Sequence, residues 1–440
     1  MARAKKETAL TPEERLQAAL VPDWEWPYKL PENWCWVYAP HIFDIEYGKG
    51  LPTKQLSDTG YPVFGANGQI GFYSEYMYKE PQALMSCRGA YSGTMNKSLP
   101  YSYVTSNSLI ILSPRGLMGT DCIYYLFSAL NVSELISGTA QPQVTVQAFD
   151  GFPIPLSPLA EQQRIVDRIE SLFAKLDEAK EKAQAVVDSF ETRKAAILHK
   201  AFTGELTAKW REEHGVGMES WEKKRLSDVV TEFKYGTSEK SDYNNKGIPV
   251  LRIPNIGDNG IDLSDIKYLN HRNVDSESQI HEGDILIIRS NGSRDLVGKA
   301  VLVPELGCEY AYASFLIRAK PNHSIINAHY LTIFLNSTDA RGQMFRRAKS
   351  SAGINNINTK ELGAISLTVP SLPEQDEIVH IINEMMDKDQ QSKEAAEAVL
   401  DQIDLMKKSI LARAFRGELG TNDPSEEGAV ELLKEIIRRG

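Results

Sequence analysis

A repeated segment constrains the fold of this chain more than any other feature of its sequence. Residues 159–206 and 372–419 align without a gap at a constant offset of 213, and 21 of the 48 aligned positions are identical. Average amino-acid usage would give about 3 identities by chance. The chain therefore carries an internal duplication, and its architecture has to accommodate two related copies.

Each copy is predicted to form one long helix. Prolines stand at its beginning, an acidic residue in its first turn complements the helix dipole, and a glycine after its basic last turns is typical of a left-handed cap. These residues are Pro158, Glu161 and Gly204 in the first copy and Pro370, Pro373, Glu374 and Gly417 in the second. A helix of roughly 43 residues at about 1.5 Å per residue would be about 65 Å long.

Apolar residues recur within each copy at alternating steps of four and three, the pattern of a coiled-coil seam. Arg193 interrupts the first seam, and Asp389 and Ser392 fall on the second. Because a single helix cannot bury such a stripe by itself, the two copies are expected to pack on each other. The seam comprises Ile165, Ile169, Leu172, Leu176, Ala179, Ala183, Val186, Phe190 and Ile197 in the first copy, and Ile378, Ile382, Met385, Ala396, Val399, Ile403, Met406 and Ile410 in the second.

Pairing between two chains, as in an oligomerisation coil, would bury the same stripe. Pairing within one chain is favoured because both copies belong to the same chain and each follows a domain-sized segment. If a pseudo-two-fold axis relates the halves, the helices run antiparallel and the preceding segments lie at opposite ends of the rod.

The segments before the helices are rich in Gly, Pro, Asn, Ser, Tyr and short β-branched runs, which is typical of strands joined by turns. Both segments open alike, with ENWCW at Glu32–Trp36 and ESWEK at Glu219–Lys223, and Tyr-Gly follows in each at 47–48 and 235–236. Little else aligns between them. The predicted strands are Tyr61–Phe64, Leu109–Leu112, Val250–Ile253, Asp284–Arg289 and Ala300–Val303.

These patterns predict an α+β protein in which two β-rich domains are separated by two long antiparallel coiled-coil helices. The predicted boundaries are 1–33 for a leader with a short helix, 34–157 for the first β-rich domain, 158–210 for the central helix, 211–370 for the second β-rich domain, 371–420 for the C-terminal helix and 421–440 for a tail helix.

Composition excludes several classes of protein. The chain is 42% hydrophobic and 25% charged, and it has neither an apolar run of roughly 18 residues nor a signal-peptide stretch in MARAKKETALTPEERLQAAL. Four scattered cysteines (Cys35, Cys87, Cys122, Cys308) indicate a reducing, cytoplasmic location. The net charge of −10 argues against a nucleic-acid binder that relies on whole-surface charge, but not against local recognition or help from a basic partner.

No catalytic or metal-binding motif is found in the sequence. The eight histidines lack HxH and HExxH spacing, and the phosphate-loop-like stretch at 292–300 is one residue too long and ends in Ala300 where Ser or Thr would bind magnesium. The G-x-S-x-G, G-x-G-x-x-G and Asn/Asp-Pro-Pro-aromatic signatures are absent as well. The chain is therefore interpreted as non-catalytic, without a metal or cofactor of its own.

Polar and aromatic side chains gather on glycine-rich turns of both β-rich segments. Amide and guanidinium groups can bond base edges bidentately, which is compatible with a role in DNA reading. Asn and Gly can equally form the turns while Tyr fills the core, and the sequence leaves this alternative open. The candidates are Asn67, Gln69, Arg88 and Tyr91 in the first segment and Arg252, Asn255, Arg289, Asn291 and Arg294 in the second.

Taken together, these segments resemble the specificity (S) subunit of type I restriction-modification enzymes. The matching features are the LAEQ and LPEQ helix starts, the AFTGEL and AFRGEL helix ends, the leader ALVPDWEWPYKLPENW at 19–34 and the closing GELGTNDPSEEGAVELLKEIIRR at 417–439. The β-rich domains match mainly in layout and in turns such as FGANGQIGFY at 64–73 and IRSNGSRDLVGKA at 288–300.

The resemblance implies that each β-rich domain is a target recognition domain reading one half of a bipartite site on double-stranded DNA. The helices would set the distance between the halves and dock two modification (M) subunits, which would bind S-adenosylmethionine and methylate adenine. Restriction (R) subunits would add cleavage driven by ATP and magnesium. Because the two domains differ in sequence, the site is expected to be asymmetric. No membrane contact is expected.

Two other hypotheses remain at this stage. A coiled-coil scaffold whose β-rich modules bind protein or another ligand, such as a glycan, would show no salt-dependent DNA binding even with a methyltransferase present. An enzyme in its own right would need an active site that the sequence does not show.

Overall fold

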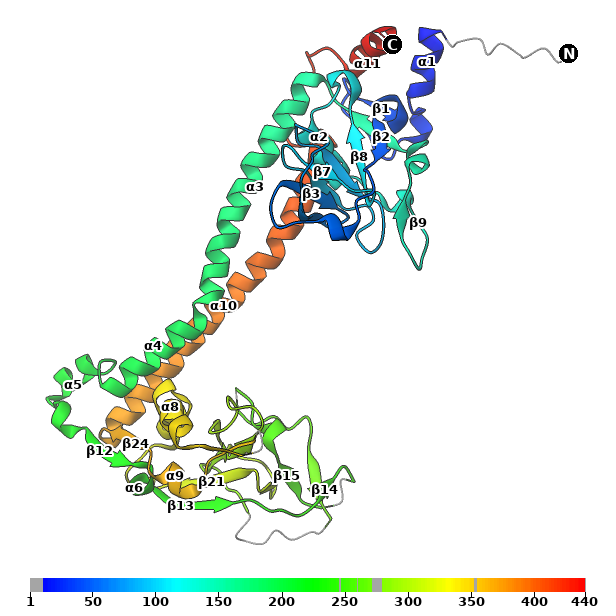
Figure 1. The fold of residues 1–440 in the computed structure, drawn as a ribbon. Helices are drawn as coiled ribbons and strands as arrows, with labels where there is room; N and C mark the ends of the chain where they lie inside the picture. The colour runs from blue at the N-terminus through cyan, green and yellow to red at the C-terminus, as the bar shows by residue number, and fades with distance from the viewer. Residues whose placement is uncertain (1–10, 245–246, 259, 271–278, 352–353, 440) are drawn as a thin grey trace. The chain divides into compact units, whose positions relative to one another are not determined.

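The computed structural model describes residues 11–244, 247–258, 260–270, 279–351 and 354–439 (Figure 1). The first ten residues, which form part of the N-terminal stretch considered for export, lie outside this range. The chain divides into two compact units, Met1–Gln184 with Ala398–Gly440 (unit 1) and Ala185–Glu397 (unit 2). Among the described residues, no helix is both long enough and apolar enough to span a bilayer.

The second repeat forms one uninterrupted helix, whereas the first is broken. Helix α10 runs over Leu372–Ala414, but the first copy forms α3 (Leu159–Asp188) and α4 (Phe190–Thr203). The prediction of a single helix is therefore wrong by one residue, Ser189. Its hydroxyl donates to the Ala185 carbonyl (2.6 Å) and the Arg193 guanidinium donates to the Val186 carbonyl (3.0 Å), so side chains compete with the backbone for helix acceptors.

Contacts between the two repeats run antiparallel within each unit. In unit 1, Lys407 Nζ lies 2.6 Å from Asp177 Oδ1, and Lys180 Nζ lies 3.6 Å from Asp404 Oδ1. In unit 2, two of the three residues that interrupt the seams meet each other, because Arg193 Nε bonds Asp389 Oδ1 at 2.6 Å. Later residues of the first copy thus contact earlier residues of the second.

Burial along the seam is uneven. Five isoleucines of the seam are almost completely buried, and Ala183 and Ala396 are also buried. Met385, Val399 and Met406 remain 39–40% exposed. Four of the five isoleucines belong to the hydrophobic cores, whereas Ile403, Ala183 and Ala396 are buried along the helices outside them. The five isoleucines are Ile165, Ile169, Ile378, Ile382 and Ile403.

Unit 1 holds small sheets around an aromatic core that includes Trp36, Phe127 and Phe149. Strand β1 (Cys35–Tyr38) pairs with β11 (Pro153–Leu156), the four-stranded sheet has the order β2 (Asp44–Tyr47), β8 (Ser108–Leu112), β5 (Ala83–Ser86), β6 (Met95–Lys97), and the three-stranded sheet has the order β4 (Gly68–Tyr73), β3 (Tyr61–Gly65), β7 (Tyr103–Val104). The remaining elements are α1 (Pro12–Ala19), α2 (Thr120–Ala129), the pair β9 (Ile136–Ser137) and β10 (Gln143–Val144), and α11 (Ala429–Arg439).

Unit 2 has the corresponding sheets. Strand β12 (Glu222–Arg225) pairs with β24 (Ser366–Val369). One four-stranded sheet has the order β13 (Val230–Tyr235), β21 (Leu316–Pro321), β17 (Ile285–Ile288), β19 (Ala300–Leu302). Another has the order β14 (Ser241–Asp242), β16 (Lys267–Leu269), β15 (Pro249–Leu251), β20 (Ala311–Tyr312). A third sheet has the order β18 (Ser290–Asn291), β23 (Ile354–Asn356), β22 (Lys349–Ser351), and the helices are α5 (Ala208–His214), α6 (Leu226–Val229), α7 (Ala328–Asn336), α8 (Thr338–Arg347) and α9 (Thr359–Gly363).

The two units repeat one topology although their sequences barely align. The parallel pair β3·β7 (Val63↔Tyr103) corresponds to β15·β20 (Val250↔Ala311). The antiparallel pair β5·β8 (Ser86↔Ser108) corresponds to β17·β21 (Ile288↔Leu316). The duplication therefore extends through the β-rich segments, and the mixture of helices and strands is α+β, as predicted.

All five predicted strands are present, with small differences at their ends. The largest difference is at Val250–Ile253, where β15 already ends at Leu251. The chain there turns into a short 3₁₀ segment at Ile253–Asn255, because Pro254 has no N–H to continue a strand ladder.

Candidate nucleic-acid interface

The candidate residues lie on four polar segments that occupy two pairs of equivalent places in the duplicated fold. The segment 66–69, with the turn between β3 and β4, follows β3, and the segment 252–255 follows its counterpart β15. The loop at 87–93 follows β5, and the segment 289–294 follows its counterpart β17. Sequence alignment did not show this correspondence.

Two serines hold the two loops of unit 1 together. The Ser108 hydroxyl donates to the Gly65 carbonyl at 3.0 Å, and the Ser86 hydroxyl donates to the Ala66 carbonyl. Asn67 is exposed on the resulting tight turn, and Gln69 is exposed in strand β4 directly after it. Gly68 has a φ of +78°, in the left-handed region that favours glycine, so the turn depends on this residue.

The second loop of unit 1 is fixed by backbone contacts with the segment before β10. The Gly89 N–H donates to the Pro142 carbonyl at 2.9 Å, and the Ser92 hydroxyl donates to the same carbonyl at 2.8 Å. Arg88 and Tyr91 are exposed on this loop, and the exposed fraction of Tyr91 is 49%. Burial raises the pKa of the neighbouring Cys87 thiol, which keeps it neutral.

The corresponding loop of unit 2 presents arginines supported by aromatic rings. The Arg289 guanidinium lies 4.4 Å from the ring centroid of Tyr235, and the Arg294 guanidinium lies 5.1 Å from that of Phe345. Asn291 is half-buried, and its Oδ1 accepts from the Ser293 N–H at 2.7 Å. Stacking on a ring restricts a guanidinium without using its donors, so Arg289 and Arg294 are held while they remain able to bond a ligand.

Two candidates of unit 2 have structural duties instead. Asn255 is 1% exposed; its Nδ2 donates to the carbonyls of Asp262 (2.8 Å) and Asp265 (2.9 Å), and its Oδ1 accepts from the Arg252 N–H (2.8 Å). Arg252 Nη2 lies 3.0 Å from Asp265 Oδ2, and the side chain is 18% exposed. Asn255 is not accessible to a ligand and leaves the candidate set, whereas Arg252 is held by Asp265 and lines a groove.

Sequence reasoning missed the residues that follow the Tyr-Gly pairs. A Cβ on Gly48 would lie 2.3 Å from the Thr105 carbonyl oxygen, and one on Gly236 would lie 2.1 Å from that of Tyr312, so only glycine permits these close approaches. Lys49 comes next and forms a parallel bridge with Thr105, and Thr237 forms one with Ala313. The repeated Tyr-Gly was the signal that could have found these positions. We call the polar segments after β3 and β5 the loop cluster of unit 1, and those after β15 and β17 the loop cluster of unit 2.

The acidity of the chain lies away from the loops. Residues 34–157 carry 6 basic and 8 acidic residues, and 211–370 carry 20 of each. Residues 371–440 carry 9 basic and 16 acidic residues, which accounts for −7 of the net −10. Among the described residues, no group of three or more His, Cys, Asp or Glu side chains could hold a metal.

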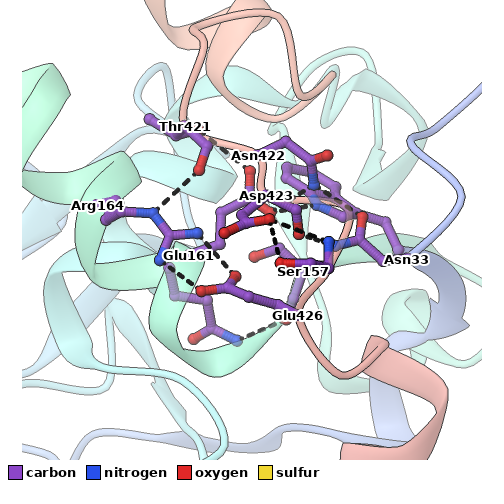
Figure 2. Close-up of polar contacts among 11 residues, drawn as sticks. Asn33, Ser157, Glu161, Arg164, Thr421, Asn422, Asp423 and Glu426 are labelled. Atoms are coloured by element: carbon purple, nitrogen blue, oxygen red, sulfur yellow. Dashed lines mark hydrogen bonds and ion pairs between the residues drawn. The ribbon is translucent and has the colours of Figure 1, made fainter.

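A buried glutamate joins each long helix to its β-rich segment, and Figure 2 shows the joint of unit 1. Glu161, at the start of α3, is 0% exposed. Its carboxylate accepts from Trp34 Nε1 (2.7 Å), Asn422 Nδ2 (2.9 Å) and the Thr421 hydroxyl (3.2 Å). Beside it, Arg164 forms a two-pronged ion pair with Glu426 at 2.8 and 2.7 Å.

Unit 2 repeats the joint at the start of α10. Glu374 is 0% exposed and accepts from Trp221 Nε1 (3.0 Å), the Thr207 hydroxyl (2.7 Å) and Arg211 Nη1 (2.5 Å). The sequence suggested only a dipole role for the two glutamates. Trp34 of ENWCW and Trp221 of ESWEK are their partners, which explains why both segments open alike.

Comparisons with known proteins agree with this architecture. A family model described as "Type I restriction modification DNA specificity domain" matches residues 31–187 and 218–400. The chain is 27% identical over 425 residues to the EcoKI specificity subunit of Escherichia coli K12, covering 89% of this chain and 90% of the relative. It is 24% identical over 426 residues to the StySPI specificity subunit of Salmonella potsdam, with the same coverages.

Solved structures share the fold. A crystal structure of the HsdS subunit from Thermoanaerobacter tengcongensis has a TM-score of 0.60 at 20% identity, covering 90% of this chain and 99% of that one. A chain from a structural study of complex assembly and conformational transition of the type I restriction-modification system has a TM-score of 0.64 at 20% identity, covering 89% and 100%. Since the family model spans both halves of the sequence, the chain belongs to the family of type I restriction-modification DNA specificity subunits.

Proposed function

We propose that this chain reads an asymmetric, bipartite site on double-stranded DNA, with the loop cluster of each unit contacting one half-site. The observation that carries the proposal is that equivalent loops of a duplicated fold present different side chains. Unit 1 offers Asn67, Gln69, Arg88 and Tyr91, while unit 2 offers Arg289, Asn291 and Arg294. Two unlike readers on one scaffold would select two unlike half-sites.

The chemistry of these loops suits the major groove. Asn and Gln bond adenine bidentately, and Arg bonds guanine O6 and N7. Each such contact discriminates against a wrong base by about 1–3 kcal/mol. Near-neutral recognition segments supply little non-specific attraction to phosphate, so affinity for the duplex would depend on partner subunits that enclose it.

The helices would set the distance between the half-sites and dock two modification subunits. Those subunits would bind S-adenosylmethionine and methylate adenine, and restriction subunits would add ATP- and magnesium-dependent cleavage. This chain would contribute recognition and no bond-making step, in the cytoplasm. The scaffold hypothesis, with modules for protein or another ligand, predicts instead that the chain does not affect which DNA sequence is methylated.

The test is to express the chain with its cognate modification subunits and map methylated adenines in cellular DNA. A bipartite motif with unlike halves is expected. Exchange of residues 34–157 for the corresponding domain of a relative should change one half-site and leave the other unchanged. A change in both halves, or a motif that does not depend on this chain, would refute the two-reader proposal.

A further inference from the structure

We infer that Phe315 is a specificity-determining residue of unit 2 that contacts the 5-methyl group of a thymine in the target. The equivalent position in unit 1 is Asn107. The inference rests on the proposed function, because it names one base contact within the same loop cluster.

The equivalence of the two positions follows from backbone pairing. Phe315 directly precedes β21, and its carbonyl accepts from the Arg289 N–H at 2.9 Å. Asn107 directly precedes β8, and its carbonyl accepts from the Cys87 N–H at 3.0 Å. In both units, therefore, this residue connects the end of a central strand to the first residue of the recognition loop. Both side chains are exposed.

Phe315 is an exposed ring on a fixed backbone. The Ser314 N–H donates to the Thr237 carbonyl (2.8 Å) and the Leu316 N–H donates to the Ala313 carbonyl (2.9 Å), so the turn is fixed on both sides. The ring is nevertheless 57% exposed. Because the backbone of this turn is already fixed, binding a ligand to the exposed ring costs no further backbone entropy. This favours binding.

The surroundings of the ring match the edge of a thymine. A shallow groove of about 390 Å³ runs beside Phe315, and the polar residues that line it include Thr237, Ser238, Glu239, Lys240 and Arg252. Thymine presents its O4 acceptor next to its methyl group in the major groove. A hydrogen-bond donor beside an apolar ring is complementary to this acceptor and methyl group. The backbone of Arg289 is bonded to that of Phe315, so Arg289 would contact a neighbouring base.

Deoxyuridine provides a direct test, because it differs from thymidine only by the missing methyl group. The full chain, in complex with its modification subunits, is titrated with duplexes in which each thymine of the unit 2 half-site is replaced in turn. We expect wild-type binding to fall about fourfold at one position, the effect of one buried methyl group. The Phe315→Ala complex should bind the thymine and uracil duplexes equally.

Two controls separate this contact from general effects. Leu263→Ala removes another exposed apolar side chain of unit 2 (44% exposed) and should preserve the thymine preference. Asn107→Ala should relax one position of the other half-site only. The inference is overturned if no thymine shows a loss, if Phe315→Ala keeps the same preference, or if it weakens all sequences equally. A wild-type complex without any sequence preference would instead refute the proposed function itself.

Discussion

The joints at Glu161 and Glu374 have the same task but different chemistry. In unit 2 one continuous stretch, residues 204–221, supplies the tryptophan, the hydroxyl and a guanidinium that is only 8% exposed. In unit 1 the start of the β-rich segment supplies Trp34, and the tail supplies Thr421 and Asn422, so all three donors are neutral. The bonds to a buried carboxylate can thus come either partly from a cation or from neutral donors, provided that its lone pairs are satisfied.

The difference also indicates what each joint depends on. Glu374 depends on Arg211, whose Nη2 also donates to the Gly204 carbonyl at 2.5 Å, so the end of α4 is tied to the start of α10 through one residue. Glu161 depends on segments from the two ends of the chain. Further contacts tie these ends together, including the Tyr28 hydroxyl with the Phe415 carbonyl (3.0 Å).

The largest effect is expected from changing the helix length between the two joints. If both joints anchor their helices rigidly, an insertion of four residues within 175–190 adds about 6 Å, close to two base-pair steps. Four residues are near one helical turn and can be absorbed as local unwinding of a coiled coil. Methylation mapping should show unchanged half-sites separated by a longer spacer. A folded variant that still methylates the original spacing would show that the helices are not a ruler.

The next effect separates the two joints. Glu374→Ala leaves the buried Arg211 guanidinium without its partner and should lower the free energy of unfolding by about 3–5 kcal/mol. Glu161→Ala leaves only neutral donors without their acceptor and should lower the free energy of unfolding by about 1–3 kcal/mol. Urea unfolding followed by tryptophan fluorescence can measure both, because Trp221 and Trp34 lie in the joints.

A double substitution checks the cause of this difference. Arg211→Met with Glu374→Gln removes both charges, and it should recover much of the stability lost in Glu374→Ala. If Glu161→Ala proves as costly as Glu374→Ala, the cation is not what distinguishes the joints.

The loops should differ from the joints in the kind of effect they show. Arg289→Ala should leave stability nearly unchanged and relax one position of its half-site by about 1–3 kcal/mol. Asn255→Ala, in a buried hydrogen-bond network, should lower stability by about 1–3 kcal/mol while the mapped motif stays the same. Relaxed specificity in Asn255→Ala would return this residue to the set of base contacts.

The sequence predicted those features that repeat along the chain or follow a period. The helix pair, the strands and the α+β class follow from duplication and alternation, and polar loops were recognised by composition. Asn255 and Asn67 look alike in sequence because both stand in polar turns, yet one is buried by carbonyls from residues 262–265 and the other is exposed. The correspondence between loops, and hence Asn107 and Phe315, depends on strand pairing over more than twenty residues, which no local pattern encodes.

The smallest effect concerns the ion pair that accompanies the joint of unit 1. The side chains of Arg164 and Glu426 are 39% and 23% exposed, so water screens the pair. Arg164→Gln should therefore lower the free energy of unfolding by only about 0.2–1 kcal/mol. The hydrogen bonds from Arg164 lower the pKa of Glu426 below its ordinary 4.5. The stabilisation is therefore fully present above pH 4.5 and is lost as the pH falls through the lowered value. Urea unfolding at neutral pH should show the difference between wild type and Arg164→Gln shrinking with added salt, and acid should abolish it. A difference that persists under both conditions would show that the Nε bond to the Thr421 carbonyl (3.0 Å), not the charge, holds the tail against α3.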